Sequence, residues 1–393
     1  MSKIFIVSEL FYPDTTSTAH IMTKIAQRLA KDAEVHVICG PAGYNREQMA
    51  VKAEELPGVT IHRLKVPNWN KNKLPLRLAK AMMLTVRMIA TSLSKIKKND
   101  RVLVVTNPPT ITLAMPLVKK LKGCKLSLLA HDVFPDNIAL SGMVNPMGLP
   151  FRLAKCLSDK AYSCYDSIAS IGRDMSEFIA EKTAKFKHKP EIVLIPNWAD
   201  PYPYSEVKDA STPDGIEILY AGNIGRGQVL GRFADAFMKS ENPSLRFNLR
   251  GNGAMVGKVQ EFGKQDHRII YSGPYNRAEQ FDVLSTADLC LVSLRPGLKG
   301  KVVPSKTYNI LQAGKAVLYV GDYDSEVARM ISEHNIGYCF TYDDSDKLTK
   351  FLNELTLEDK PRLKEMGQRA RQLAETVYSE QTQLEKFRAL MQN

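Results

Sequence analysis

The sequence lacks several features that mark whole classes of protein. No run among its 393 residues approaches roughly 18 consecutive apolar residues, so no transmembrane helix is expected. The apolar run next to Met1 is too short for the core of a signal peptide, and we interpret it as a first strand. The six cysteines are scattered without a C-x-x-C pair, which argues against a disulfide framework or a zinc site and fits a reducing cytoplasm.

Acidic residues are missing from one long interval of the chain. No Asp or Glu lies between Glu55 and Asp100, whereas ten basic residues do: Arg63, Lys65, Lys71, Lys73, Arg77, Lys80, Arg87, Lys95, Lys97 and Lys98. The net charge of +12 arises entirely in residues 1–200, which hold 29 Lys and Arg against 17 Asp and Glu, because residues 201–393 hold 25 of each. The positive electrostatic potential of such a region attracts partners that carry phosphate groups. The candidates are nucleic acid, an anionic membrane surface and a lipid pyrophosphate.

The segment 74–96 inside this basic interval has the pattern of an amphipathic helix. Its apolar residues recur at helical spacing, at Leu74, Leu78, Met82, Val86 and Ile89. One interpretation is a helix packed on a sheet with a solvated basic face. The other is a helix that lies on a membrane surface. Lipid headgroups would then contact the basic side chains in this helix and just before it, which are Lys71, Lys73, Arg77, Lys80 and Arg87. We expect no nucleic-acid partner, because aromatic residues are not interleaved with the charges.

Short apolar runs alternate with helix-period segments along the whole chain. The predicted strands are 3–8, 34–39, 59–66, 101–106, 125–130, 167–171, 191–195, 216–221, 245–251, 268–271, 288–294, 316–320 and 337–340. Strands rich in Val, Ile and Leu that are spaced by helices indicate βαβ units and parallel sheets. The fold class is therefore α/β.

A proline-rich stretch at 196–204 predicts a linker, because it can continue neither a strand nor a helix. We expect two Rossmann-like, doubly wound domains, over 1–198 and 199–378. The last predicted helix, within 379–393, has no strand after it and is expected to cross back to the first domain. Ligands of open α/β sheets bind outside the carboxyl ends of the strands, so we expect a cleft between the domains and one ligand on each.

Glycine-rich turns follow three successive strands of the second half. The first contains Gly222, Asn223, Gly225, Arg226 and Gly227, the second contains Gly251, Asn252 and Gly253, and the third covers 272–275. The spacing matches neither the G-x-G-x-x-G fingerprint nor a P-loop. Such turns let backbone N–H groups approach a phosphate, and a helix start favours an anion. The simpler interpretation is that the glycines serve packing alone.

A Gly- and Lys-rich loop leads into a helix that the sequence predicts to start at Pro304 or Ser305. Lys306 would lie in the first turn, where a cation opposes the helix dipole. A bound diphosphate would supply the missing negative charge. The alternative is a lysine that extends along the surface into solvent.

Two further candidates lie in the first half. His131 and Asp132 stand at the end of the predicted strand 125–130, where a strand opens toward a cleft, although a lone His is more often structural. The loop 12–19 carries Thr15, Thr16 and Ser17 before the first helix. Their hydroxyls either face a phosphate or sugar or simply cap that helix.

Taken together, these motifs resemble family 4 glycosyltransferases, which are retaining, nucleotide-sugar-dependent enzymes of the GT-B fold. The resemblance covers nearly the whole chain in the expected order, at 11–14, 131–132, 195–200, 220–225, 251–253, 287–288 and 313–314. The segment 304–308, taken with Gln228, is most similar to the subgroup that builds bacterial O-antigen and capsule repeat units. That subgroup includes transferases of N-acetylated deoxyhexosamines.

The resemblance implies roles for single residues. Arg226 and Lys306 would hold the donor diphosphate, and His131 would lie near the donor sugar and the acceptor hydroxyl. Tyr275 would contact the base and Asn309 the ribose. The full donor-binding set is Gly222, Asn223, Gly225, Gly227, Gly251, Asn252, Gly253, Tyr275, Pro304, Ser305, Thr307 and Asn309. The acceptor and membrane set is Thr15, Thr16, Ser17, Asp132, Lys71, Lys73, Arg77, Lys80 and Arg87.

The sequence departs from the family pattern at three positions. The two positions of the usual E-x7-E pattern read Lys301 and Asn309, and Gly231 stands where many relatives carry a Lys. Lys306 would therefore supply the second positive charge alone. The resemblance also implies that no metal and no other cofactor is required. The D-x-D from Asp322 to Asp324 follows the predicted strand 316–320 and is interpreted as part of a turn.

The expected function is that of a cytoplasmic retaining glycosyltransferase held peripherally at the inner membrane. It would move an N-acetylated sugar or a deoxyhexose from a UDP-sugar, bound by the C-terminal domain, to an acceptor on a polyprenyl pyrophosphate, bound by the N-terminal domain. The product would belong to O-antigen, capsule or related lipopolysaccharide. Two alternatives remain open: a UDP-sugar epimerase of the same fold, and an inactive nucleotide-sugar-binding scaffold subunit.

Overall fold

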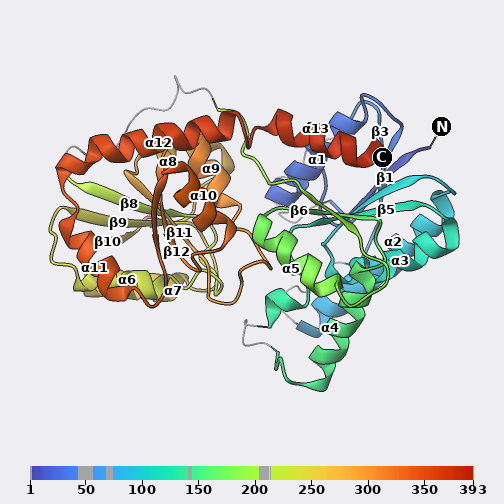
Figure 1. Cartoon of the computed structure of the whole chain (residues 1–393), viewed down its shortest axis with the longest axis horizontal. Coiled ribbons are helices and arrows are strands. Elements are labelled where there is room, and N and C mark those ends of the chain that lie inside the picture. The colour runs from blue at the N-terminus through green and yellow to red at the C-terminus, as the bar shows by residue number, and fades with distance from the viewer. Residues whose placement is uncertain are drawn as a thin grey trace. The chain divides into compact units, whose positions relative to one another are not determined.

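The computed structural model describes residues 2–42, 56–67, 74–139, 144–202, 212 and 214–392, without the side chains of Leu74, Pro75, Arg77 and Leu78. The chain divides into two units (Figure 1). Unit 1 comprises Met1–Ile195 and Leu384–Asn393, and unit 2 comprises Pro196–Gln383. The change from unit 1 to unit 2 thus lies three residues before the predicted domain boundary.

Unit 1 is built on a seven-stranded parallel sheet in the order β3-β2-β1-β4-β5-β6-β7. The strands are β1 (Ile4–Ser8), β2 (Val35–Cys39), β3 (Val59–Arg63), β4 (Arg101–Val105), β5 (Lys125–Ala130), β6 (Ser167–Ser170) and β7 (Glu191–Leu194). Every strand predicted in this half is present, and β3 is three residues shorter than predicted. The α/β fold class is confirmed.

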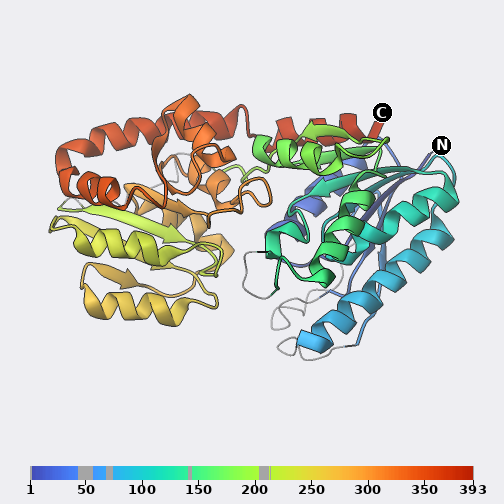
Figure 2. The same cartoon turned by 60° about the horizontal axis from the view of Figure 1, so that its bottom comes forward.

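The helices of unit 1 cover both faces of this sheet (Figures 1 and 2). They are α1 (Ser17–Leu29), α2 (Leu74–Lys95), α3 (Pro109–Lys122), η2 (Asp136–Ile138), α4 (Leu149–Tyr162), α5 (Arg173–Thr183) and most of α13 (Glu380–Gln392). Helix α3 lies between α2 and α4, and the three run side by side in Figure 2. The C-terminal helix α13 is held to α1, because Arg28 Nε donates to Glu385 Oε1 at 2.7 Å.

Unit 2 contains a six-stranded parallel sheet in the order β10-β9-β8-β11-β12-β13. Its strands are β8 (Ile216–Ala221), β9 (Leu245–Arg250), β10 (Ile269–Tyr271), β11 (Leu289–Ser293), β12 (Ala316–Val320) and β13 (Gly337–Phe340). The helical segments are α6 (Leu230–Lys239), α7 (Val256–Gln265), η4 (Arg277–Glu279), α8 (Gln280–Ser285), α9 (Lys306–Gln312), α10 (Glu326–His334), α11 (Ser345–Glu354), η5 (Leu357–Asp359) and α12 (Lys360–Glu375).

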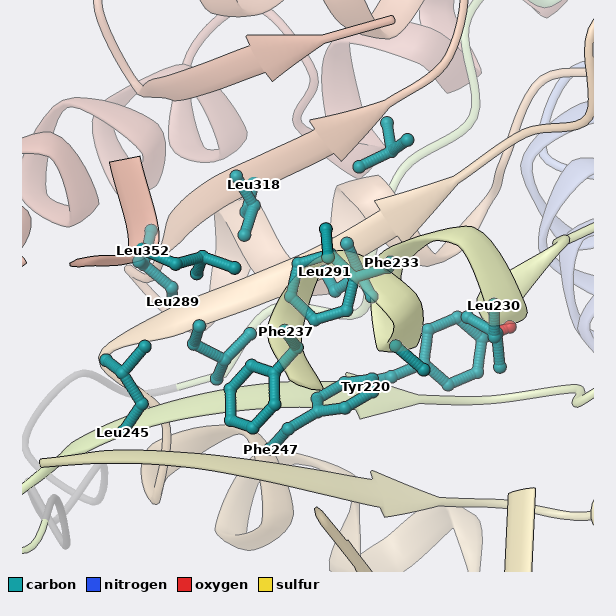
Figure 3. Packing of buried hydrophobic residues seen from close by; sticks show 14 of the residues in the cluster. Tyr220, Leu230, Phe233, Phe237, Leu245, Phe247, Leu289, Leu291, Leu318 and Leu352 are labelled. Carbon is teal, nitrogen blue, oxygen red and sulfur yellow. The ribbon is translucent and has the colours of Figure 1, made fainter. Parts of the chain in front are cut away.

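The core of unit 2 lies on both faces of its sheet, which explains why the central strands β11 and β12 are almost continuously apolar, whereas β9 alternates apolar and polar residues. On β8, Ile218 and Tyr220 point to one face and Leu219 and Ala221 to the other. Figure 3 shows the first face, where the ring of Tyr220 lies among the phenylalanines of α6 and β9. This packing fixes Tyr220 close to the carboxyl end of β8.

The apolar stripe of α2 does not form its packed face. Of the two interpretations of this helix, the one in which the stripe packs on the sheet does not hold for Met82 and Val86, whose side chains are 53% and 60% exposed. The buried face carries Leu84 and Met88 together with small polar residues. Both stripes of this helix are apolar enough to be buried, so helical periodicity alone did not distinguish them. No helix in the described part of the chain is long and apolar enough to cross a membrane.

Candidate active site

The strand order of each sheet reverses at one point, and such a point is where open α/β sheets bind ligands. In unit 2 the order reverses between β8 and β11. The carboxyl end of β8 leads into Gly222, and the loop after β11 leads to Lys306. In unit 1 the order reverses between β1 and β4, and His131 follows the neighbouring strand β5. The sequence candidates therefore gather at the carboxyl ends of both sheets.

Glycine is required where the loops after β8 and β9 pack against each other. Gly222 and Gly251 have φ values of 134° and 140°, in the region that side chains disfavour. A Cβ added at Gly251 would lie 1.8 Å from the Gly222 carbonyl oxygen, and one at Gly253 would lie 2.4 Å from the carbonyl oxygen of Ile224. Backbone packing, the simpler of the two interpretations of the sequence, therefore accounts for these glycines.

The N–H groups of the same glycines already have partners within unit 2. Gly222 and Gly251 donate to backbone carbonyl oxygens, both at 2.9 Å. Gly225 donates to the side-chain oxygen of Gln228 at 3.1 Å, and Gly253 also donates to a side chain, at 2.8 Å. A bound anion can replace a side-chain acceptor more easily than a backbone one. These four N–H groups are therefore already paired within unit 2, and an anion bound at these loops would depend largely on the nearby side chains.

Lys306 is the most unusual of these side chains. Its Nζ is buried and has no hydrogen-bond partner in the described chain, although the residue as a whole is only partly buried. The Nζ lies 3.4 Å from the centroid of the Tyr220 ring and 3.3 Å from where a Gly222 Cβ would stand. Burial lowers the pKa of Lys306 from 10.5 to about 7, and the nearby Cys290 opposes this shift only in part. The ammonium thus lacks an anionic partner in the chain.

Other predicted residues surround Lys306 without matching its burial. Arg226 is exposed and has no side-chain partner in the described residues, so its guanidinium is a free cation on the β8 loop. Gly227 accepts a hydrogen bond from the backbone N–H of Arg295 at 2.8 Å, which ties the β8 loop to the loop after β11. Asn223 and Asn252 are exposed.

Helix α9 begins at Lys306, one or two residues later than predicted. Ser305 just before it is exposed, while Pro304 and Asn309 are half-buried. Thr307 is fully buried, and its hydroxyl has no partner among the described residues. Two neighbouring polar groups at the start of α9 are therefore buried without a partner.

Tyr275 follows β10, the third strand in the row β8, β9 and β10. It is half-buried and packs on the apolar cluster around Leu219. Burial raises the pKa of Tyr275, so its hydroxyl stays neutral at physiological pH. The three glycine turns predicted from the sequence thus belong to adjacent strands.

In unit 1, His131 stands directly after β5, as the sequence predicted. The Thr106 hydroxyl accepts hydrogen bonds from the backbone N–H groups of His131 and Asp132, at 3.2 and 3.3 Å, which fixes this turn. The Nε2 of His131 is buried and unpartnered in the described chain. Burial lowers the pKa of His131 to about 4, so the imidazole is neutral at pH 7. Asp132 is exposed as a residue, but burial of its carboxyl group raises the pKa of Asp132 to about 6, against the opposing effect of a hydrogen bond from the Asn137 side chain.

Buried ion pairs fix the segment that follows His131. Asp136, five residues further on, binds Lys182 of α5 at 2.6 Å, and Lys182 binds Asp159 of α4 at the same distance. The side chain of Lys182 is only 1% exposed. Sequence reasoning missed this network, because its members lie on three separate elements.

The hydroxyl residues of the first loop divide between the two roles that the sequence left open. Thr16 caps α1, since its Oγ1 accepts a hydrogen bond from the Ala19 N–H at 3.3 Å. Thr15 and Ser17 are exposed. Of the basic candidates, Lys71, Lys73 and the side chain of Arg77 lie outside the described residues. Lys80 is half-buried and Arg87 is exposed.

Sequence reasoning also missed Glu9, which directly follows β1 at the reversal point of unit 1. Its Cγ lies 3.4 Å from where a Gly40 Cβ would stand. Burial raises the pKa of Glu9, and Lys80 acts in the opposite direction. The carboxyl makes no side-chain hydrogen bond within the described residues. A charged residue directly after a buried strand was the signal available in the sequence.

Comparison with solved structures and known sequences agrees with this architecture. The crystal structure of Anabaena Alr3699/HepE in complex with UDP has a TM-score of 0.69 to this chain at 12% identity, over 100% of both chains. No family model matches. Because a curated glycosyltransferase is 30% identical to this chain over 99% of its length, the chain nevertheless belongs to the glycosyltransferases, and it has the two-domain GT-B fold.

Two curated sequences place the chain within that class. It is 30% identical over 403 residues to the probable glycosyltransferase WbjE of Pseudomonas aeruginosa, covering 99% of this chain and 97% of that protein. It is 26% identical over 251 residues to WcaI of Escherichia coli strain K12, a putative colanic acid biosynthesis glycosyl transferase, covering 59% of this chain and 60% of that protein. The predicted resemblance to polysaccharide-building glycosyltransferases is confirmed.

Proposed function

We propose that this glycosyltransferase moves an N-acetylated sugar or a deoxyhexose, with retention of configuration, from a UDP-sugar to an acceptor on a polyprenyl pyrophosphate. The product would be a repeat unit of a bacterial surface polysaccharide. WcaI is named for colanic acid biosynthesis and HepE binds UDP, which support the class of product and the class of donor respectively. Retention and the choice of acceptor rest on the resemblance to family 4.

The observation that carries the proposal is the unpartnered amine of Lys306 at the reversal point of unit 2. A buried ammonium without a counter-ion is costly, because neither water nor a carboxylate stabilises it. A diphosphate bound beside the β8 loop removes that cost, because it supplies the negative charge. The exposed guanidinium of Arg226 lies in the same loop and provides a second, mobile cation.

Lys306 and Arg226 act on the step in which negative charge develops on the departing diphosphate. The bond between C1 of the sugar and the diphosphate oxygen breaks, and its electron pair goes to the departing nucleoside diphosphate. The acceptor hydroxyl oxygen forms the new bond to C1, and its proton passes to the departing diphosphate. Lys306 stabilises the growing negative charge more than it stabilises the intact donor, so it lowers the barrier.

His131 of unit 1 is suited to hydrogen bonding rather than to charge stabilisation. Its low pKa keeps the imidazole neutral, and its Nε2 has no partner in the described chain. A neutral imidazole nitrogen can donate to or accept from a sugar hydroxyl, depending on its tautomer. We assign His131 to positioning the sugar, and Glu9 and Asp132 to the acceptor side of unit 1.

The membrane contact in this proposal uses the basic interval of unit 1. Arg87 is exposed and Lys80 half-exposed on α2. An anionic leaflet and a polyprenyl pyrophosphate both offer phosphate groups to these side chains.

A donor screen tests the proposal. Thermal unfolding is followed with UDP, GDP, ADP and dTDP, and then with UDP-sugars, because a ligand that binds only the native state raises the melting temperature. We expect UDP to give the largest shift and Lys306→Met to lose it. NMR of the product then reads the anomeric configuration. Equal shifts for all four nucleotides would contradict the UDP assignment, and an inverted product would contradict retention.

A further inference from the structure

Exposed large hydrophobic side chains are not spread evenly over unit 1. Those found in its described part lie on three neighbouring helices or just before the third: Met82, Val86, Leu117, Leu121, Met147, Leu149, Leu153 and Leu157. The described part of unit 2 has four, on scattered elements. Single exposed hydrophobics are normal, but a cluster on adjacent helices indicates an interaction surface.

Helix α4 presents the clearest apolar face. Leu149, Leu153 and Leu157 follow one another at four-residue spacing and therefore lie along one side of the helix. They are 77%, 58% and 54% exposed. The opposite side is anchored in the fold, because Asp159 and Tyr162 are buried. The buried residues of α4 lie within its last five positions, 158–162, so the helix is anchored at its C-terminal end and the preceding turns carry most of the apolar face.

Helices α2 and α3 continue this surface. On α2 the exposed apolar stripe includes Met82 and Val86, and on α3 it includes Leu117 and Leu121. Helix α3 contacts both of its neighbours, and Figure 2 shows the three helices in one layer. We call this set of exposed side chains on α2, α3 and α4 the three-helix face.

The charges of the three-helix face have one sign. Neither α2 nor α3 contains any acidic residue, and the only acidic residue of α4, Asp159, is buried in the ion pairs with Lys182 and Lys185. Arg87, Lys120, Arg152 and Lys160 are exposed on these helices. A surface that is apolar and cationic but without carboxylates matches the anionic headgroup and acyl boundary of a phospholipid layer.

We propose that the three-helix face inserts its apolar side chains into one leaflet of an anionic phospholipid bilayer while its Arg and Lys side chains contact the lipid phosphates. This inference rests on the proposed function, in which the acceptor is a glycolipid. It goes beyond the electrostatic membrane contact proposed for the basic interval, because it assigns the main anchor to the apolar side chains of α4, outside that interval. The apolar contact is not screened by salt, whereas attraction through charge alone is.

Vesicle flotation tests the insertion with liposomes of phosphatidylcholine and phosphatidylglycerol at a ratio of three to one. The test variant combines Leu149→Gln, Leu153→Gln and Leu157→Gln. The matched control combines Ile270→Gln, Leu357→Gln and Val377→Gln, three similarly exposed positions of unit 2. We expect the α4 variant to bind vesicles at least about tenfold more weakly and the control to bind like the original chain. We also expect the original chain to stay bound in about 0.5 M NaCl.

An environment-sensitive fluorophore on Cys156 provides a second readout, because this thiol is exposed on α4. Its emission is expected to shift to the blue on vesicles. Equal binding of the α4 variant and the original chain, or complete release of the original chain by salt, would overturn the inference. So would a dimer in light scattering that the α4 variant converts to a monomer without loss of vesicle binding, since a second copy would then cover the face.

Transfer to a short-chain, water-soluble acceptor separates this inference from the proposed function. If insertion is correct, the α4 variant keeps this activity and loses only transfer to acceptor held in vesicles. If the proposed function fails, neither chain transfers sugar to the soluble acceptor, whatever the flotation result.

Discussion

Each unit of the molecule buries one lysine beside a functional loop, and the two lysines have opposite environments. Lys182 in unit 1 touches two carboxylates at 2.6 Å and faces the Tyr162 ring at 5.4 Å. Lys306 in unit 2 also lies over a tyrosine ring, that of Tyr220, but it has no carboxylate and no hydrogen-bond acceptor in the described chain. Both amines thus lie over a tyrosine ring, and among the described residues carboxylate partners are found for Lys182 alone of the two.

The difference separates a structural ion pair from a binding group. Burial raises the pKa of Asp159, but hydrogen bonds from Lys182 and Lys185 outweigh it, so the pKa of that carboxyl is lowered and the carboxylate stays ionised. Lys306 has no such partner, and burial alone lowers its pKa. A fold retains an uncompensated buried amine when a ligand completes the site. Each prediction below tests one side of this contrast.

Replacing Lys182 by Met is expected to have the largest effect. Asp136 and Asp159 would remain buried with less compensation, and removal of one partner from a buried ion pair costs about 3–5 kcal/mol of folding free energy. Urea unfolding measures the change. The control Lys185→Ala removes an exposed partner of the same Asp159 and should cost less than about 1 kcal/mol. If Lys182→Met lowered the free energy of unfolding by less than about 1 kcal/mol, Lys182 would not differ from Lys306 in its contribution to stability.

Lys306→Met is expected to separate activity from stability. Turnover should fall by about 100- to 1000-fold, as when one charge-stabilising group is lost at a reacting centre. The free energy of unfolding should stay the same or rise, because the variant no longer buries an unpaired ammonium. Steady-state kinetics and urea unfolding give the two numbers. A variant that is both inactive and clearly less stable would show that Lys306, like Lys182, contributes to folding.

The pH dependence should follow the pKa of Lys306. Because that pKa falls from 10.5 to about 7 on folding, the unfolded chain binds more protons between these values. The contribution of Lys306 to stability therefore rises as pH increases through this window, and Lys306→Met should abolish this rise. UDP binding should weaken by up to about tenfold per pH unit above pH 7, because the amine must take up a proton. Calorimetry at pH 8 in two buffers measures this uptake, and its absence would show that the amine is already charged.

The smallest effect is expected at Tyr220. Tyr220→Leu removes the aromatic face below the Lys306 ammonium, which should weaken UDP binding by about 0.5–2 kcal/mol. Tyr220→Phe is the matched control. It keeps the ring and loses only the hydrogen bond from the hydroxyl to the Asn223 carbonyl oxygen, at 2.6 Å. Equal weakening by both variants, measured by titration calorimetry, would assign the effect to the hydroxyl.

Much of the fold was predictable because it depends on local pattern. Buried parallel strands are continuous apolar runs, so β5, β8, β12 and β13 match their predicted limits. The orientation of α2 was not predictable in this way, because two of its stripes are apolar and only the tertiary structure selects one.

The site was predictable where single motifs define it. The glycine turns, His131 and Lys306 stand at strand ends and helix starts that the sequence reveals. What the sequence could not provide is the distance relations: the Tyr220 ring beneath Lys306, or the pairing of Asp136 with Lys182, 46 positions away. Such contacts arise only when separate elements pack together.

The buried amine of Lys306 has a practical consequence. A pKa of about 7 leaves a large share of this amine uncharged at neutral pH, whereas ordinary lysines are almost fully protonated. An uncharged amine is a nucleophile that forms imines with aldehydes. A reagent that joins an aldehyde to a phosphate, such as pyridoxal phosphate, would be guided to this lysine if the proposed diphosphate site is correct, and borohydride would then fix a permanent label on Lys306.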